Sequence, residues 1–171
     1  MSHTVRIQFP IVTTPKRDDF LRKLQLLVDS DFEELVLIAP FVDGQLMQNL
    51  LKRFPFGGRR LTIVTRYGDL FKDQKRSLQA AVVALARQAK KDPTLAERIK
   101  WYVNNHVHAK LFILDWSSAL FGSQNLTYAA LKVNYEVGAY LADIANVKNA
   151  LEAFVKDVIK NSSKVLFPVE V

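Results

Sequence analysis

The sequence predicts an α/β fold in which a mixed, mostly parallel β-sheet is flanked by helices on both faces. The run 35–39 is apolar throughout, as expected of a strand that is covered on both sides. A helical pattern at 43–54 separates it from a second apolar strand at 61–65, which indicates a parallel strand–helix–strand unit. The pattern at 71–91 has an apolar stripe at helical spacing and predicts a further long helix. We expect one domain over residues 1–171.

The remaining elements follow from periodicity and from turn residues. Alternating apolar and polar residues at 5–9 predict a half-buried strand that Pro10 ends. Thr14 followed by Pro15 is typical of a helix start, and the apolar spacing continues to Val28. Further strands are predicted at 99–103, within 106–115, ending at 122, at 135–141 and at 164–167, with a helical turn at 126–131 and a helix at 147–158.

The composition indicates a soluble protein with an anionic partner. Of the 171 residues 49% are hydrophobic, which is enough for a packed core. The chain has no cysteine, which excludes disulfides and cysteine-ligated metals. The N-terminal residues lack the apolar run of a signal peptide, and no apolar stretch reaches the length of about 18 residues that suggests a membrane span. We therefore expect a cytoplasmic protein without stable membrane association, and the net charge of +7 favours nucleic acid as a partner.

The stretch 108–125 carries polar residues at fixed positions within an apolar run. In a strand, residues i and i+2 point to the same side, about 6.5 Å apart. His108 and Lys110 therefore share a side, and the same spacing recurs at 123/125 and at 134/136. Each pair can offer two polar groups to one place, and a phosphate would suit it. The positions concerned are His108, Lys110, Asp115, Gly122, Ser123, Asn125, Asn134 and Glu136.

These residue types suit phosphate chemistry. Lysine supplies positive charge, serine and asparagine supply donors, and His108 can act as nucleophile or acid. Glu136 or Asp115 can hold one tautomer of the imidazole by accepting from its second nitrogen. Asn134 is a further candidate phosphate contact, as is Arg66, which directly follows the strand at 61–65 where ligands of α/β sheets tend to bind. Each residue by itself has an ordinary structural explanation, such as a turn or a solvated charge, but the combined spacing favours function.

The full run resembles the HKD signature of the phospholipase D superfamily, HxK(x)4D(x)6GSxN, and matches it at every defined position. The resemblance implies a phospholipase D-like fold and a phosphohistidine intermediate at His108. It also implies that Glu136 orients a histidine, whereas Asp115 is more often a supporting residue. The residues that would hold the phosphate are Lys110, Ser123 and Asn125. No metal and no cofactor is expected, because few acids lie near the motif and Lys110 already supplies positive charge.

One motif supplies only half of the groups that in-line cleavage needs. A nucleophile on one side of phosphorus requires an acid on the opposite side for the leaving oxygen. His106 lies two residues before His108, so in a strand both point the same way and cannot flank one phosphorus atom. We therefore expect the second His108 to come from another copy of the chain, in a homodimer with a composite active site. The resemblance implies the same arrangement for single-motif members of the superfamily.

Three functions are compatible with the sequence. A metal-independent phosphodiesterase that cleaves DNA or RNA, hence a nuclease, agrees with the motif, with the positive charge and with a similarity in size to the superfamily's small endonucleases. A phospholipase D or phosphatidyl transferase would use the same chemistry on lipids, but no segment reads as an interfacial helix with a bulky apolar face. A non-catalytic nucleic-acid-binding subunit would not need His108 together with the other residues of the motif. The basic residues at 72–91 can contact a phosphate backbone or form an ordinary solvated face.

Overall fold

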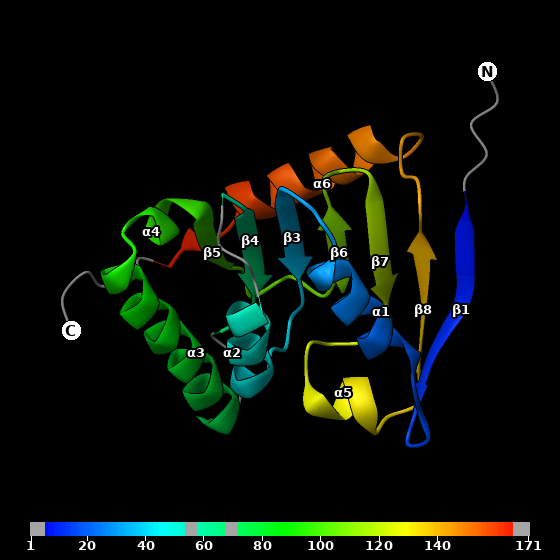
Figure 1. Ribbon diagram of the computed structural model, residues 1–171, viewed down its shortest axis with the longest axis horizontal. Coiled ribbons are helices and arrows are strands. Elements are labelled where there is room, and N and C mark those ends of the chain that lie inside the picture. Colours follow the sequence, from blue (N-terminus) through cyan, green and yellow to red (C-terminus); the bar gives the residue numbers. More distant parts are fainter. Residues whose placement is uncertain (1–5, 54–57, 68–71, 166–171) are drawn as a thin grey trace.

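In the computed structural model, residues 6–53, 58–67 and 72–165 are described, and their strands form one nine-stranded sheet (Figure 1). The strand order is β2-β1-β8-β7-β6-β3-β4-β5-β9. The strands are β1 (Ile7–Thr14), β2 (Arg17–Asp18), β3 (Glu34–Ile38), β4 (Arg60–Thr65), β5 (Ile99–Val103), β6 (Leu111–Leu114), β7 (Ser118–Gly122), β8 (Glu136–Leu141) and β9 (Ser163–Lys164). The helices are α1 (Asp19–Asp29), α2 (Gly44–Arg53), α3 (Lys72–Lys91), α4 (Thr94–Arg98), α5 (Tyr128–Lys132) and α6 (Lys148–Lys160).

The sheet is mixed as predicted, but the prediction that it is mostly parallel is wrong. Among the described strands, only β3–β4 and β4–β5 pair in parallel, and the other pairs are antiparallel. The reason is visible at β6 and β7, which are joined by the short turn 115–117. A parallel pair needs a crossover of about a dozen residues or more, so a connection this short joins antiparallel strands. The predicted strand–helix–strand unit at 35–65 is parallel as expected, and β5 extends the parallel part beyond it.

The N-terminal segment also differs from the prediction. Pro10 does not end β1, because the register with β8 shifts between Gln8 and Ile11 and an irregularity of this kind accommodates a proline. Thr14 and Pro15 do not start a helix; Thr14 pairs with Arg17 in a hairpin, and α1 begins at Asp19. The predicted motif strand is shorter than expected, since β6 begins at Leu111. The predicted positions 5, 54, 71 and 166–167 lie outside the described residues.

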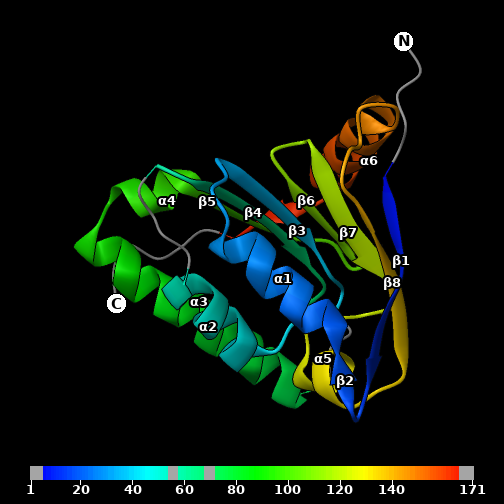
Figure 2. The same ribbon diagram turned by 45° about the vertical axis from the view of Figure 1, so that its right-hand side comes forward.

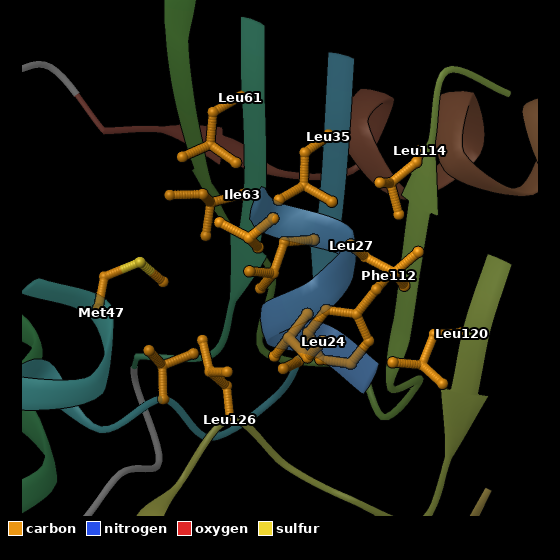
Figure 3. Packing of buried hydrophobic residues seen from close by; sticks show 14 of the residues in the cluster. Leu24, Leu27, Leu35, Met47, Leu61, Ile63, Phe112, Leu114, Leu120 and Leu126 are labelled. Carbon is orange, nitrogen blue, oxygen red and sulfur yellow. The ribbon is translucent and has the colours of Figure 1, made fainter. Parts of the chain in front are cut away.

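One face of the sheet is covered by α1, α2, α3 and α5 (Figure 2). Its core contains Phe112 of β6, which is fully buried and packs edge-on against Phe20 of α1 with ring centroids 5.7 Å apart. Leu35, Ile63 and Met47 belong to the same cluster (Figure 3). Burial of each such side chain stabilises the fold by about 2 kcal/mol. This layer therefore fixes β6, the strand that continues from His108 and Lys110.

The opposite face carries α6. Val155 and Val158 of this helix pack against Ile38, Val64 and Ile113 on three neighbouring strands. The prediction of helices on both faces is thus confirmed. At β7 and β8, α6 crosses near one end of the strands, as Figure 1 shows.

The directions of the strands place several strand ends together at one edge of the sheet. Strands β3, β4 and β5 run the same way, β6 runs opposite to β3, and β7 and β8 alternate in turn. The carboxyl ends of β3, β4, β5 and β7 and the amino ends of β6 and β8 therefore lie together, at the lower side of the sheet in Figure 1. We call this the site edge, because the motif residues His108, Lys110, Ser123 and Glu136 lie on it.

Candidate active site

His108 and Lys110 lie side by side immediately before β6. Lys110 Nζ is 3.1 Å from His108 Nδ1 and donates a hydrogen bond of 2.9 Å to the His108 carbonyl oxygen. His108 is exposed, whereas Lys110 is partly buried. A ring nitrogen and an ammonium group therefore face the same small volume at the site edge, where one phosphate could contact both.

Ser123, Asn134 and Glu136 form a second cluster, held by the pairing of β7 with β8. Ser123 Oγ donates to Glu136 Oε2, and Asn134 Nδ2 donates to Glu136 Oε1 at 3.2 Å. The backbone N–H of Val137 donates to Ser123 Oγ at 3.1 Å, and the Ser123 N–H donates to the Val137 carbonyl at 3.0 Å. Both carboxylate oxygens of Glu136 are thus occupied by this cluster, and within the described residues no hydrogen bond joins Glu136 to His108.

Glu136 and Lys110 connect the two clusters electrostatically. Burial lowers the pKa of Lys110 below its usual value, and the nearby Glu136 carboxylate raises it in part. The net result is a lowered pKa, so Lys110 loses its proton at a lower pH than an exposed lysine.

The lowered pKa gives a test of this connection. Replacement of Glu136 by glutamine removes the negative charge that favours the ammonium form, so Lys110 should titrate at a still lower pH in Glu136→Gln than in the wild type. The measurement is a 13C NMR titration of the lysine ε-carbons, with Lys110→Arg used to assign the resonance. Glu152→Gln, which removes an acid paired with Lys148 and Lys156 on α6, is the control and should leave the Lys110 titration unchanged. An unaltered titration in Glu136→Gln would refute the electrostatic connection.

Gly122 and Gly138 make room for a buried residue that the sequence reasoning missed. The two glycines face each other across β7 and β8, and Gln124 packs against both of them. Gln124 is fully buried, and neither polar atom of its side chain has a hydrogen-bond partner among the described residues. Gln124 is the variable position of the motif, so nothing in its residue type or spacing predicted a structural role. Asn125 lies beside it, partly buried, with its Oδ1 atom enclosed and unpaired within the described chain.

Arg66 lies at the carboxyl end of β4, on the site edge as expected. Its backbone N–H donates to the Pro40 carbonyl oxygen at 3.2 Å, and its guanidinium carbon lies 6.0 Å from the centre of the Phe41 ring. The side chain is partly buried. The structure thus places Arg66 on the correct edge, while its contact with a phosphate stays a prediction.

Asp115 is the one candidate that the structure separates from the others. It follows β6, whereas His108 and Lys110 precede this strand, so Asp115 lies at the opposite edge of the sheet. Its carboxylate accepts hydrogen bonds from the backbone N–H groups of Glu33 and Glu34, at 2.9 and 2.7 Å. Its φ of 51° belongs to the turn into β7, in the left-handed region that aspartate tolerates. These contacts give Asp115 a structural role in the turn, while its predicted catalytic role stays a prediction.

The structural role of Asp115 predicts different outcomes for two substitutions at this position. Asp115→Ala should lower the free energy of unfolding by about 2 kcal/mol, because two backbone donors lose their acceptor. Asp115→Asn retains an acceptor oxygen and tolerates the same φ, so its loss should be about 1 kcal/mol or less. Both variants should keep the wild-type turnover of a phosphodiester per folded molecule, measured alongside urea unfolding. A loss of turnover in the folded Asp115→Asn variant would restore the chemical role.

A groove of about 470 Å³ opens beside His108. It lies between the loop 104–109 and the carboxyl-terminal half of α6, where Phe154, Asp157 and Asn161 line it. Its position next to His108 gives a phosphate substituent a place to lie.

Among the described helices, none has the length and apolar character needed to cross a membrane.

Comparison with known proteins agrees with this arrangement. The family model described as cardiolipin synthase, PLD-like domain, matches residues 22–158, which include both clusters. The chain belongs to the phospholipase D superfamily. Its motif and its fold are those of a phosphodiesterase domain of this superfamily.

Proteins similar to this chain differ in length. Cardiolipin synthase of Listeria welshimeri is 30% identical over 60 residues, which cover 35% of this chain and 12% of that protein. The chain thus matches only about an eighth of the length of such curated relatives. Nuc, a phospholipase D family member from Salmonella typhimurium, has a TM-score of 0.71 at 18% identity, covering 95% of this chain and 99% of its own. Phosphatidylserine synthase of Haemophilus influenzae has a TM-score of 0.72 at 16% identity, covering 96% of this chain and 41% of its own.

Proposed function

We propose that this chain is a metal-independent nuclease that cleaves phosphodiester bonds of DNA or RNA through a phosphohistidine intermediate. The observation that carries the proposal is the pair at the site edge, with Lys110 Nζ 3.1 Å from His108 Nδ1. Lysine at this distance would neutralise a phosphate held against the imidazole. Asn125 and Asn134 would add donors to the phosphate, Ser123 would do so by turning its hydroxyl from Glu136 to the phosphate, and Arg66 would contact it from β4. Glu136 would orient a histidine of the shared site.

The reaction balances with two histidines. A ring nitrogen of one His108 forms a bond to phosphorus while the bond between phosphorus and the leaving oxygen breaks. The imidazolium of a second His108 gives its proton to that oxygen. The oxygen of water then forms a bond to phosphorus while the bond between phosphorus and the first histidine breaks, and the water passes a proton to the second histidine, which returns both rings to their starting states.

The second His108 is proposed to come from another copy of this chain, docked on an uncovered part of the α6 face. Ala119 and Leu141 contact the cluster under α6, and Phe121 and Val137 lie on the same side of the same strands. Phe121 is nonetheless 39% exposed and Val137 46% exposed. We call these two residues the open sheet face. Phe121 pairs with Leu111, three residues from His108, so a two-fold contact here would bring two copies of His108 together.

If the dimer forms through the open sheet face, a substitution there should abolish dimerisation and turnover together. Phe121→Asp places a charge in the contact and should give a folded monomer whose phosphodiesterase activity falls at least about tenfold. The measurement is light scattering after size exclusion, combined with turnover of a small phosphodiester. Leu26→Asp is the matched control, because Leu26 is 67% exposed on α1, on the other side of the sheet, and should leave the dimer intact. A Phe121→Asp variant that remains dimeric and active would exclude this surface.

A phospholipase or phosphatidyl transferase activity is the second candidate, favoured by the sequence similarity to cardiolipin synthases. The net charge of +7 supports nucleic acid over a zwitterionic lipid surface. A non-catalytic nucleic-acid-binding subunit is the third candidate.

One substrate panel in excess chelator separates these functions. The substrates are single- and double-stranded DNA, RNA, bis(p-nitrophenyl) phosphate and vesicles of phosphatidylglycerol with phosphatidylcholine. We expect turnover of the nucleic acids and of the small diester. Turnover of the lipids without cleavage of nucleic acid would overturn the nuclease proposal in favour of a lipid enzyme. Nucleic acid binding without turnover of any substrate would leave only the binding subunit.

A further inference from the structure

We infer that the amino-terminal part of α3 forms a phosphate track that binds the backbone of a nucleic acid strand beyond the bond being cleaved. The track consists of Lys72, Lys75 and Arg76. This inference rests on the proposed nuclease function and identifies a polymeric substrate with several phosphates. A small diester or a single lipid headgroup would occupy the site at His108 and would not extend to α3.

A series of contacts connects this track to the active site. The Lys75 ammonium lies 5.6 Å from the centre of the Tyr67 ring, and Gln79 Nε2 donates to the Tyr67 hydroxyl at 2.8 Å. The backbone N–H of Tyr67 donates to Asn105 Oδ1 at 3.1 Å. Asn105 lies three residues before His108. Contacts between neighbouring residues thus fix the amino-terminal part of α3 relative to the loop that carries the histidine.

The separation is short enough for one strand to bridge. Three residues span about 10 Å at most, so Asn105 lies within this distance of His108. Successive phosphates of a strand in a duplex are about 3.4 Å apart along the axis. A strand that passes His108 therefore reaches Tyr67 and Lys75 after a few nucleotides. Arg66, which precedes Tyr67 on the site edge, would lie along the same path.

The charge of α3 fits a polyanion. Its basic residues are Lys72, Lys75, Arg76, Arg87, Lys90 and Lys91, and its one acidic residue is Asp73. Lys72 and Arg76 are exposed, and Lys75 is partly buried. Lysine and arginine that lie near several phosphates bind them by displacing counterions, largely without regard to sequence.

The two ends of α3 differ in their relation to the site. The helix leads through α4 into the amino end of β5, which lies at the edge opposite the site edge. Arg87 is eleven residues after Arg76, which corresponds to about 16 Å along the helix axis. Figure 1 shows the amino-terminal end of α3 on the same lower side as the site edge and its carboxyl end beside α4. The track therefore comprises only the first turns of α3 and does not include Arg87 and Lys90.

This difference supplies a matched pair of variants on one helix. Lys72→Gln with Arg76→Gln removes two charges from the track, and Arg87→Gln with Lys90→Gln removes two charges from the far end. Binding of a fluorescent single-stranded 20-mer is measured by anisotropy in the His108→Ala background, so that no cleavage interferes. The first pair should weaken binding about tenfold at low salt and reduce the slope of log Kd against log salt by about 1.4, since each contact contributes about 0.7. The second pair should leave both quantities nearly unchanged.

Equal effects of the two pairs would overturn the track, because the charge of α3 would then act without regard to position. The absence of any effect from the first pair would overturn it as well. Failure of the nuclease proposal has a different signature, namely that the wild type turns over neither bis(p-nitrophenyl) phosphate nor the 20-mer. Circular dichroism of each variant verifies that α3 remains folded.

Discussion

His108→Ala is expected to abolish phosphodiester cleavage, with a loss of at least about a thousandfold in kcat, because it removes the proposed nucleophile and the proposed acid together. The side chain is exposed, so its truncation should change the free energy of unfolding by less than about 0.5 kcal/mol. The measurement is single-turnover cleavage of an oligonucleotide in chelator, combined with urea unfolding of the same preparation. Binding of the oligonucleotide should persist, because Lys110 and the basic surface remain.

Subunit mixing distinguishes a shared site from two independent sites. If both copies of His108 serve one reaction, a dimer of one wild-type and one His108→Ala subunit is inactive. After exchange between equal amounts of the two proteins, a shared site should retain about a quarter of the activity of an equal total of wild type. Independent sites would retain about half. A wild-type level of cleavage by His108→Ala would reject the phosphohistidine mechanism altogether.

Gly122→Ala is expected to lower the free energy of unfolding by about 3 kcal/mol, because the strands that carry the second cluster must move apart. A Cβ at Gly122 would collide with Gln124 Oε1 and would lie 2.5 Å from the Val137 carbonyl oxygen and 2.6 Å from Gly138 Cα. The Val137 carbonyl accepts from the Ser123 N–H, so a shift here also displaces Ser123 from Glu136. Urea unfolding and turnover should therefore both report a loss.

A double variant identifies which collision matters. Gln124→Ala relieves the contact with the glutamine side chain but leaves two backbone atoms in place. If the backbone contacts dominate, Gly122→Ala with Gln124→Ala should remain at least about 2 kcal/mol less stable than Gln124→Ala. Restoration of the Gln124→Ala stability would instead show that the side chain was the only obstacle. A Gly122→Ala protein as stable as the wild type would mean that β7 and β8 separate there without cost.

The i/i+2 spacing was sufficient to predict that His108 lies beside Lys110 and Asn134 beside Glu136, although β6 is shorter than expected. The roles of these residues in catalysis stay predictions. His108 and Lys110 precede β6, and their contact depends on a loop conformation. Asp115 lies at the opposite edge of the sheet because it follows β6, whereas His108 and Lys110 precede this strand. Gln124 could not be foreseen, because its burial follows from two glycines that pair across strands and lie far apart in sequence.

Local patterns by themselves determined most strands and helices, since each signal lies within a window of 5 to 20 residues. The motif and the basic character of α3 can likewise be recognised in the sequence alone. Only the tertiary structure decided strand direction, which depends on whether a short turn or a crossover joins two strands. It likewise decided that the ends of β3 to β8 converge on one edge and that Phe121 and Val137 stay uncovered. These features depend on contacts between distant segments, which a local sequence pattern does not encode.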